Sequence, residues 1–285
     1  MNNKTKGIIL IILSAFSFAW MFAFVRLAGD VPFVQKTFFR NFFAALLAMG
    51  VLVKSGIGFG WRKENTFGLF MRAGFGALGV LCNFYAIGKL MTADASILNK
   101  LSPFFAIIFS IFILNEKVKL YQAISVVIAF IGALFVIQPG GSAFSPAMLI
   151  AAFGGMCAGL AYTYVRKVTN NGEKGPTVVF FFSVFSCLIT APYLIFNFYP
   201  MTMHQWLSLI GAGIAAAGGQ FTITAAYSYA PAREISVFDY TQIVFTALLG
   251  FLMFGDVPNA YSFIGYFIIV GVSVVMFFIN KRQAQ

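Results

Sequence analysis

Charged residues are scarce in this sequence, and histidine is almost absent. Asp, Glu, Lys and Arg account for 9% of the 285 residues, whereas hydrophobic residues account for 60%. A soluble domain has roughly 25% charged residues, so this composition excludes one. The single histidine, His204, lies in a polar stretch. A histidine-based metal centre or catalytic cluster is therefore excluded, and we expect no metal, no cofactor and no enzymatic activity.

Paired cysteines, a nucleotide-binding loop and a basic patch are also missing. The three cysteines, Cys82, Cys157 and Cys187, lie apart from one another inside apolar stretches, which is typical of small buried hydrophobes rather than metal ligands. No GxxxxGK[ST] motif occurs, which argues against ATP as an energy source within this chain. The net charge is +11, but the basic residues form short clusters between apolar stretches. We therefore expect no nucleic-acid partner.

Apolar stretches of about 20 residues, the length that crosses a bilayer, make up most of the chain. The first, 7–25, is longer than the roughly 7–15 apolar residues of a signal peptide, so we interpret it as a retained span. We predict an all-α polytopic membrane protein, with the lipid bilayer as its surroundings. The ten predicted transmembrane helices are 7–27, 35–54, 68–89, 95–114, 120–138, 146–165, 177–197, 207–229, 233–254 and 260–279.

The second half of the chain repeats the first with a shift of 140 residues. Phe24-Val25-Arg26 corresponds to Tyr164-Val165-Arg166, Asp94 to Glu234, and Gly79 to Gly219. We therefore divide the chain into two five-helix repeats, 1–140 and 141–285. Because five is odd, the second repeat must have the opposite orientation in the bilayer. Inverted repeats are typical of transporters, whose substrate site lies at the midplane between the repeats.

Lysine and arginine predict the direction of insertion. If the N-terminus is cytoplasmic, most basic residues fall in cytoplasmic loops, and the external loops after the fifth, seventh and ninth helices hold none. This distribution obeys the positive-inside rule. We expect a multi-pass protein of the cell membrane (plasma or inner membrane) with both termini in the cytoplasm. The residues concerned are Lys4, Lys6, Lys54, Arg62, Lys63, Lys117, Lys119, Arg166, Lys167, Lys174, Arg233, Lys281 and Arg282.

Two segments in equivalent positions of the repeats carry a shared pattern. The first has Ala93-Asp94-Ala95-Ser96-Ile97-Leu98, Leu101-Ser102-Pro103 and Leu114-Asn115-Glu116-Lys117; the second has Phe238-Asp239-Tyr240-Thr241, Leu248-Leu249-Gly250 and Phe254-Gly255-Asp256-Val257-Pro258. With ten spans in an inverted repeat, the chain resembles the EamA group of the drug/metabolite transporter superfamily. Asp256 stands where that group usually has Glu, which keeps the carboxylate. The resemblance implies transport, of cargoes ranging from amino acids to vitamins and nucleotide-like metabolites.

Polar residues inside two spans are the strongest candidates for a site. Asn99 and Lys100, and their repeat equivalents Asp239 and Tyr240, lie five to seven residues inside their helices and approach the midplane from opposite sides. Charges inside a span are costly and usually face a cavity or one another. Either Lys100 and Asp239 form a structural ion pair or extend to the membrane surfaces, or they bind substrate and a coupling proton. Pro103 removes a backbone donor and frees the carbonyl of Asn99.

Further candidates are basic and aromatic. Four basic residues, Arg26, Lys36, Arg40 and Lys89, lie on the predicted outer side; Arg40 is the one we favour for substrate. A basic vestibule attracts anionic solutes, although loop charge beside Asp30 and Asp94 is the alternative explanation. Aromatic rings on the first, third, sixth and eighth spans are the other candidates for binding an organic solute: Trp20, Phe24, Tyr85, Tyr162 and Tyr227.

Other recognisable features have structural explanations. Gly74-Phe75-Gly76-Ala77-Leu78-Gly79 matches a dinucleotide fingerprint, but it lies in an apolar span with no preceding strand, so we expect these glycines to permit close helix packing. Glu116 and Asp256 occupy the same repeat position beside turns, where each is expected to cap a helix or pair with a base. Asp94 and Glu234 open spans, where negative charge suits a helix N-terminus.

Secondary transport of a small organic metabolite is the leading functional prediction. Lys100 and Arg40 would hold a carboxylate, and Asp239 with aromatic rings would hold an amino group, which favours an amino acid or an amino-acid-like solute. The alternative cargo is a larger aromatic or nucleotide-like metabolite such as a flavin or S-adenosylmethionine, and the alternative mechanism is a passive channel. The proton gradient is the candidate energy source. The direction of transport, and whether the protein is a monomer or a homodimer, stay open.

The charge pattern yields a topology prediction. Reporter fusions at Gly141 should report an external location and fusions at Gly172 a cytoplasmic one, because basic loops stay in the cytoplasm. Fusions after Lys6 and after Arg282 should both report the cytoplasm. Termini on different sides of the membrane would contradict the inverted repeat.

Overall fold

The computed structural model describes residues 3–115, 118–229 and 236–282, and within these ranges every regular element is helical. This confirms the all-α prediction. Over the same ranges, nine segments are long and apolar enough to cross a membrane, and Phe238–Phe254 is a shorter apolar helix. The elements are α1 Asn3–Leu27, α2 Phe33–Ser55, η1 Lys63–Asn65, α3 Thr66–Ile87, α4 Thr92–Asn99, α5 Ser102–Ile113, α6 Leu120–Ile137, α7 Pro146–Asn170, α8 Gly175–Asn197, α9 Met203–Tyr229, η2 Ser236–Tyr240, α11 Thr241–Phe254 and α12 Ala260–Arg282.

Two of the ten predicted spans differ from continuous α-helices. The span predicted at 95–114 is interrupted between α4 and α5, with Pro103 in the first turn of α5. The span predicted at 233–254 consists of the 3-10 turn η2 followed by α11, while residues 233–235 lie outside the described ranges. The two interruptions stand 140 residues apart, so they occupy the same place in each repeat. Proline accounts for the first, because it has no N–H to continue the ladder.

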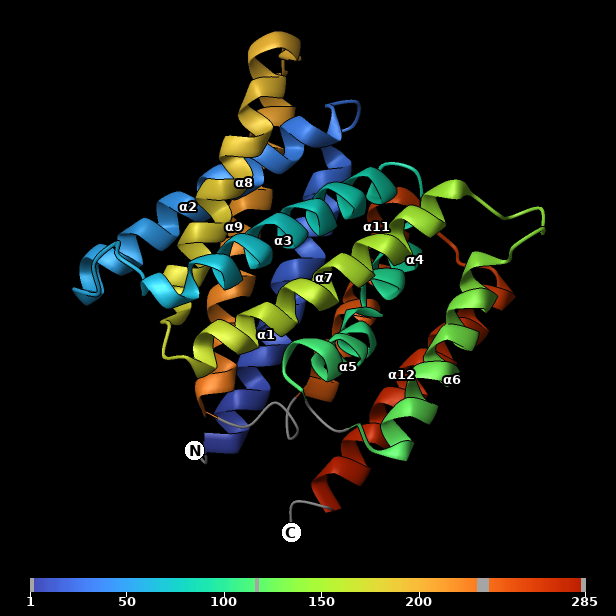
Figure 1. Ribbon diagram of the computed structural model, residues 1–285. Coiled ribbons are helices and arrows are strands. Elements are labelled where there is room, and N and C mark those ends of the chain that lie inside the picture. The colour runs from blue at the N-terminus through green and yellow to red at the C-terminus, as the bar shows by residue number, and fades with distance from the viewer. Residues whose placement is uncertain (1–2, 116–117, 230–235, 283–285) are drawn as a thin grey trace.

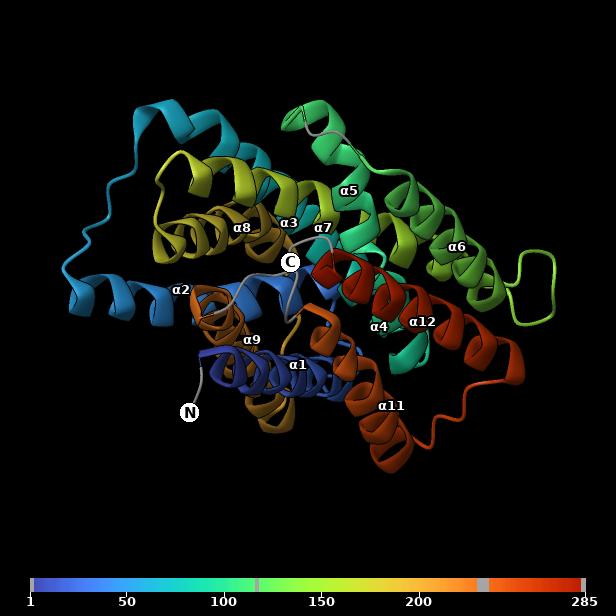
Figure 2. The ribbon, with the colours of Figure 1, turned by 90° about the horizontal axis from the view of Figure 1, so that it is seen from below.

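The two repeats interlock rather than fold side by side. The most extensive helix contacts, α1 with α9, α3 with α7, α6 with α12, and α2 with α8, each join one repeat to the other. Figures 1 and 2 show these pairs lying next to each other, with α6 and α12 set apart at one side of the bundle. The start of α1 and the end of α12 lie at the same end of the molecule (Figure 1). Chain ends on one side are consistent with an even number of crossings.

Small residues set the closest helix crossings. A Cβ on Gly79 of α3 would lie 3.1 Å from the carbonyl oxygen of Gly154 in α7. The equivalent crossing joins α1 to α9, where the Ser14 hydroxyl donates to the carbonyl of Gly219 at 2.8 Å. Gly79 and Gly219 are repeat equivalents, as are Ser14 and Gly154. The glycine-rich segment of α3 thus serves helix packing, which small residues permit in membranes.

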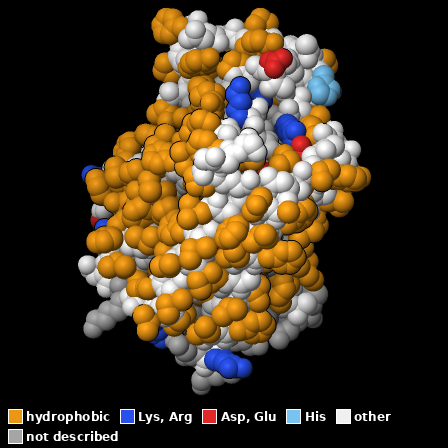
Figure 3. All heavy atoms as spheres, turned by 90° about the vertical axis from the view of Figure 1, so that its right-hand side faces the viewer, with side chains coloured by type: hydrophobic (Ala, Val, Ile, Leu, Met, Phe, Trp, Pro, Cys, Tyr) orange, Lys and Arg blue, Asp and Glu red, His pale blue; other side chains and the backbone are white. Residues whose placement is uncertain are grey.

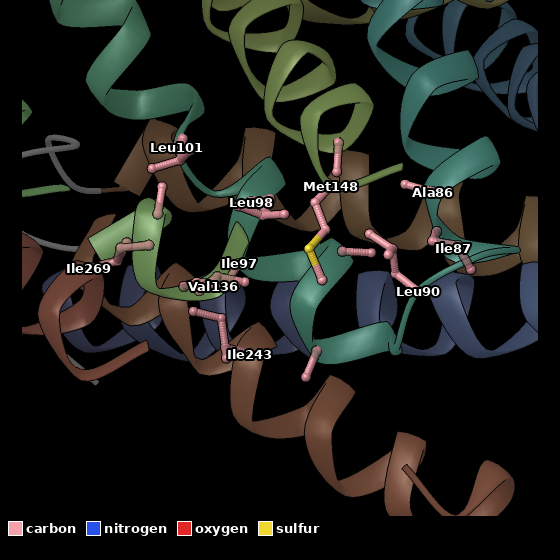
Figure 4. Packing of buried hydrophobic residues seen from close by; sticks show 14 of the residues in the cluster. Ala86, Ile87, Leu90, Ile97, Leu98, Leu101, Val136, Met148, Ile243 and Ile269 are labelled. Carbon is pink, nitrogen blue, oxygen red and sulfur yellow. The ribbon is translucent and has the colours of Figure 1, made fainter. Parts of the chain in front are cut away.

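Buried apolar side chains surround α4. Figure 4 shows Ile97, Leu98 and Leu101 packed among side chains of α6, α7, α11 and α12, including Met148 and Ile243. The outer surface is also apolar, with large side chains such as Phe196 and Phe267 exposed. On the face that carries α6 and α12, hydrophobic side chains form a broad band, and the few charged ones lie toward its margins (Figure 3). Apolar residues on both the inside and the outside are expected of a bundle in lipid.

Glycines of α7 cover the interruption between α4 and α5. A Cβ on Gly155 would lie 2.7 Å from the carbonyl oxygen of Leu98, and a Cβ on Gly159 would lie 2.6 Å from that of Ser102. Helix α7 therefore shields the interrupted backbone from lipid. This matters because lipid offers no hydrogen bonds to free backbone groups.

Adding one methyl group at Gly155 should destabilise the fold. The methyl would collide with backbone that cannot move without shifting α4, and overpacking of this kind costs about 1–3 kcal/mol. Gly271→Ala is the matched control, because a Cβ there meets nothing within 4 Å. In an unfolding experiment in detergent micelles, Gly155→Ala should lower the free energy of unfolding, and Gly271→Ala should leave it unchanged or raise it. Equal effects would contradict the close packing.

Candidate functional site

An ion pair joins the two helix interruptions. Lys100 Nζ donates to Asp239 Oδ2 at 2.5 Å, and the two side chains are only 10% and 17% exposed. The Tyr240 hydroxyl donates to the carbonyl oxygen of Lys100 at 3.3 Å. Lys100 and Tyr240 are repeat equivalents, as are Asn99 and Asp239. The chain thus brings both copies of one sequence position together where the repeats meet.

One oxygen of this pair remains open. Asp239 Oδ2 accepts from Lys100, but the buried Oδ1 has no hydrogen-bond partner among the residues that the structure describes. A buried acceptor without a partner is costly. A donor on a solute would remove that cost.

A cavity lies against the ion pair. It is lined by residues from α1, α2, α3, α7, α8 and α9, from the end of α4, and from the junction of η2 with α11. The polar and aromatic residues in its lining are Phe18, Phe22, Arg40, Arg72, Asn83, Asn99, Lys100, Tyr162, Phe182, Gln220, Asp239 and Gln242. Both repeats contribute, so the cavity sits at their interface.

Two arginines share one aromatic ring in the lining. The guanidinium carbon of Arg72, on α3, lies 4.2 Å from the centre of the Phe182 ring, and that of Arg40, on α2, lies 5.8 Å from it. Both distances are within the range of a cation–π contact. Arg40 is 3% exposed and Arg72 is 6% exposed. Gly76 makes room for this arrangement, because a Cβ there would lie 2.1 Å from Arg72 Nη1 and 3.0 Å from Phe182.

The nine predicted site residues fall into four groups. Asn99, Lys100, Asp239, Arg40 and Tyr162 line the cavity. Tyr240 is buried beside it, on the backbone of Lys100.

The aromatic candidates on α1 and α3 pack elsewhere. Trp20 lies 5.4 Å from Phe24, centre to centre, and Tyr85 lies 5.5 Å from Phe33. Neither Trp20 nor Tyr85 is among the described residues that line the cavity. The side chain of Tyr227 lies outside the described part of the chain.

Arg72, Phe182, Gln220 and Gln242 line the cavity but did not emerge from the sequence. Three of these four residues could have been recognised from the sequence. Arg72, Gln220 and Gln242 are polar side chains inside predicted apolar spans, the same property that singled out Lys100. Phe182 is one of 37 phenylalanines, and no pattern distinguishes it from the others.

Most other charged candidates have structural partners. Arg26 pairs with Asp256, donating Nη2 to Oδ1 at 2.9 Å, and the Thr92 amide at the start of α4 donates to Asp256 Oδ2 at 3.2 Å. These contacts agree with the structural role expected of Asp256, because its carboxylate caps α4 and pairs with the base Arg26. Lys36 Nζ donates to the carbonyl of Gly29 at 2.7 Å.

The remaining acids at span ends are Asp94, Glu116 and Glu234. Asp94 lies in the first turn of α4 and accepts from the Tyr266 hydroxyl at 2.6 Å. Glu116 and Glu234 lie outside the described residues. Over the ranges described, no group of three His, Cys, Asp or Glu side chains could hold a metal ion.

The sequence model of the EamA-like transporter family matches this chain twice, over residues 5–138 and 145–278. The chain belongs to the EamA-like transporter family. The double match accounts for the repeat-related contacts above, because each match covers one five-helix unit. The protein is thus a multi-pass membrane transporter of the EamA type.

The names of relatives within the family refer to different transported compounds. The chain is 30% identical to the pseudopaline exporter CntI of Pseudomonas aeruginosa over 274 residues, covering 95% of both proteins. It is 27% identical to a riboflavin transporter of Brucella anthropi, covering 86% of this chain and 88% of that protein. A solved crystal structure with 16% sequence identity matches with a TM-score of 0.70 over 99% of both chains, which supports the fold alone.

The Lys100–Asp239 pair should show strong energetic coupling. Replacing one partner leaves the other charge buried without compensation, so Lys100→Gln and Asp239→Asn should not be additive. A double-mutant cycle on the free energy of unfolding should give an interaction energy of about 0.5–3 kcal/mol. The surface pair Arg62–Glu64, with side chains 59% and 65% exposed, is the control and should give about 0.2–1 kcal/mol. Coupling no larger than the control would contradict an ion pair in solution.

Proposed function

We propose that this protein is a secondary transporter of a small organic carboxylate, and that it works by alternating access around the cavity between the repeats. One observation carries the proposal: both interrupted helices present a charged side chain to the same cavity, and these charges join the two repeats. Irregular backbone inside a membrane is tolerated where it is buried in protein or lines a cavity. In transporters, such interruptions in the two repeats flank the substrate.

The polar lining favours an amino-acid-like cargo. Asp239 Oδ1 has no partner among the described residues and would accept from an amino group. Lys100 is already paired with Asp239, so the cation that remains for a carboxylate, among the residues expected from the sequence, is Arg40. Asn99 adds a neutral polar group to the same lining. We propose that cargo bridges Asp239 and Arg40 and loosens the Lys100 pair on binding.

A larger aromatic metabolite is the second candidate. Four aromatic side chains line the cavity: Phe18, Phe22, Tyr162 and Phe182. The name of the riboflavin transporter also favours an aromatic cargo. The pseudopaline exporter is named for export and the riboflavin transporter for no direction, so the proposal for this chain leaves import and export both open. Thermal-shift measurements with amino acids, riboflavin and S-adenosylmethionine would separate the two cargo classes, because only a bound solute stabilises the folded protein.

Transport itself is tested in proteoliposomes. A secondary transporter should accumulate cargo against its concentration gradient when a proton gradient is imposed, and uptake should saturate with cargo concentration. A passive channel would only equilibrate cargo. We propose the cell membrane as the site of action, with both termini in the cytoplasm.

Asp239 is the candidate proton carrier. Protonation of its carboxylate would release Lys100, whereas an amide binds no proton. Asp239→Asn should therefore lose proton-driven accumulation and retain exchange of cargo across the membrane. Asp30→Asn removes an exposed carboxylate and should retain both activities. Full accumulation by the Asp239→Asn variant would reassign this residue to a structural role.

A further inference from the structure

The cavity carries an excess of positive charge. Its charged lining residues are Arg40, Arg72, Lys100 and Asp239, and Lys100 is compensated by Asp239. Two arginine charges remain. Arginine stays protonated in proteins, so neither arginine can escape the cost of burial by losing its charge.

The acids that the structure describes do not compensate these two arginines. The sequence has eight Asp and Glu residues. Apart from Asp239, the described ones are engaged elsewhere or lie in loops: Asp94 with Tyr266, Asp256 with Arg26, Glu64 with Arg62, Glu173 with Asn65, and Asp30 in the exposed turn after α1. No ion pair to Arg40 or Arg72 occurs among the described residues.

The guanidinium groups are held in place but not satisfied. Arg40 donates Nη1 to the neutral side chain of Asn41 at 2.5 Å, and Arg72 stacks on Phe182. The Nε atoms of both arginines are buried and have no hydrogen-bond partner in the described part of the chain. Orphaned donors on two nearly buried cations, in the wall of a cavity, indicate an anionic ligand. The planar guanidinium group matches carboxylate oxygens in a two-pronged geometry.

We infer that Arg40, Phe182 and Arg72 form an anion subsite that selects cargo with two carboxylates. The inference rests on the proposed transport function and narrows its cargo class. One carboxylate binds each guanidinium, and an amino group, where present, binds Asp239 Oδ1. A solute with a single carboxylate leaves one buried arginine uncompensated, and this penalty creates the selectivity.

The test compares solutes that differ in one carboxylate. The probes are L-glutamate against L-glutamine, and glutarate against its mono-amide, which keep nearly the same shape. Binding to the purified full-length protein is measured by calorimetry, and competition is measured as inhibition of cargo uptake in proteoliposomes. We expect the wild-type protein to prefer the dicarboxylate of each pair by at least about ten-fold, the equivalent of about 1.4 kcal/mol.

Two kinds of variant locate the selectivity. Arg72→Gln removes a charge and should bring the ratio of the affinities for the dicarboxylate and the mono-amide close to one. Arg40→Gln should have the same effect. Gly76→Ala keeps every charge but places a methyl 2.1 Å from Arg72 Nη1, so it should reduce the preference by displacing the guanidinium. Gly74→Ala, two residues away, meets nothing within 4 Å and should leave the preference unchanged. The preference is a ratio, so a general loss of stability does not alter it.

The outcomes separate this inference from the proposed function. A wild-type protein that accumulates cargo but binds dicarboxylates and mono-amides alike, or binds neither, overturns the anion subsite and leaves the transporter intact. A preference that survives both arginine substitutions also overturns it. Absence of any gradient-driven uptake across a metabolite library instead contradicts the transport function.

Discussion

A helix that is interrupted inside an apolar layer must have its free backbone groups covered by protein, because lipid cannot hydrogen-bond to them. This constraint organises the centre of the molecule. Glycines of α7 bring backbone against the interruption between α4 and α5, and the Tyr240 hydroxyl reaches the carbonyl of Lys100. Interlocked repeats are the consequence, since the cover for each interruption comes largely from the other repeat. A single five-helix repeat would leave its interrupted helix open to lipid.

Charge is placed in the same protected region. Lys100 and Asp239 neutralise each other across the repeat interface, whereas Arg40 and Arg72 contact the Phe182 ring, and Arg40 also the neutral Asn41 amide, with no ion pair among the described residues. The cavity therefore combines one compensated pair with two cations that have no ion pair in the described part of the chain. A pair that links the repeats is suited to a switch, because on the proposed mechanism solute or proton binding would compete directly with one of the contacts between them. Uncompensated cations are suited to recognition, because their cost is relieved only by the right anion.

The fold was largely predictable from the sequence. Length and hydropathy were sufficient to predict the positions of the spans. The correspondence of Gly79 with Gly219 revealed the repeat, and the two glycines lie at equivalent crossings, of α3 with α7 and of α1 with α9. Pro103 indicated irregular backbone near Asn99, where α4 ends. The 3-10 turn before α11 had no such marker, so the span at 233–254 was predicted as continuous. Its equivalence to the first interruption becomes apparent only when the two repeats are aligned with each other.

The site was predictable in part, and the division has a physical cause. Burial of a charge in a span is a property of the sequence alone, so Lys100, Asp239 and Arg40 could be identified as unusual without any structure. Which charges neutralise one another depends on the rotation and crossing of helices from distant parts of the chain, about which hydropathy contains no information. The tertiary structure therefore decided that Lys100 meets Asp239, that Arg26 meets Asp256, and that Arg40 and Arg72 share Phe182. It likewise decided which rings face the cavity, since a ring that packs between helices and a ring that faces a solute occupy equally apolar sequence.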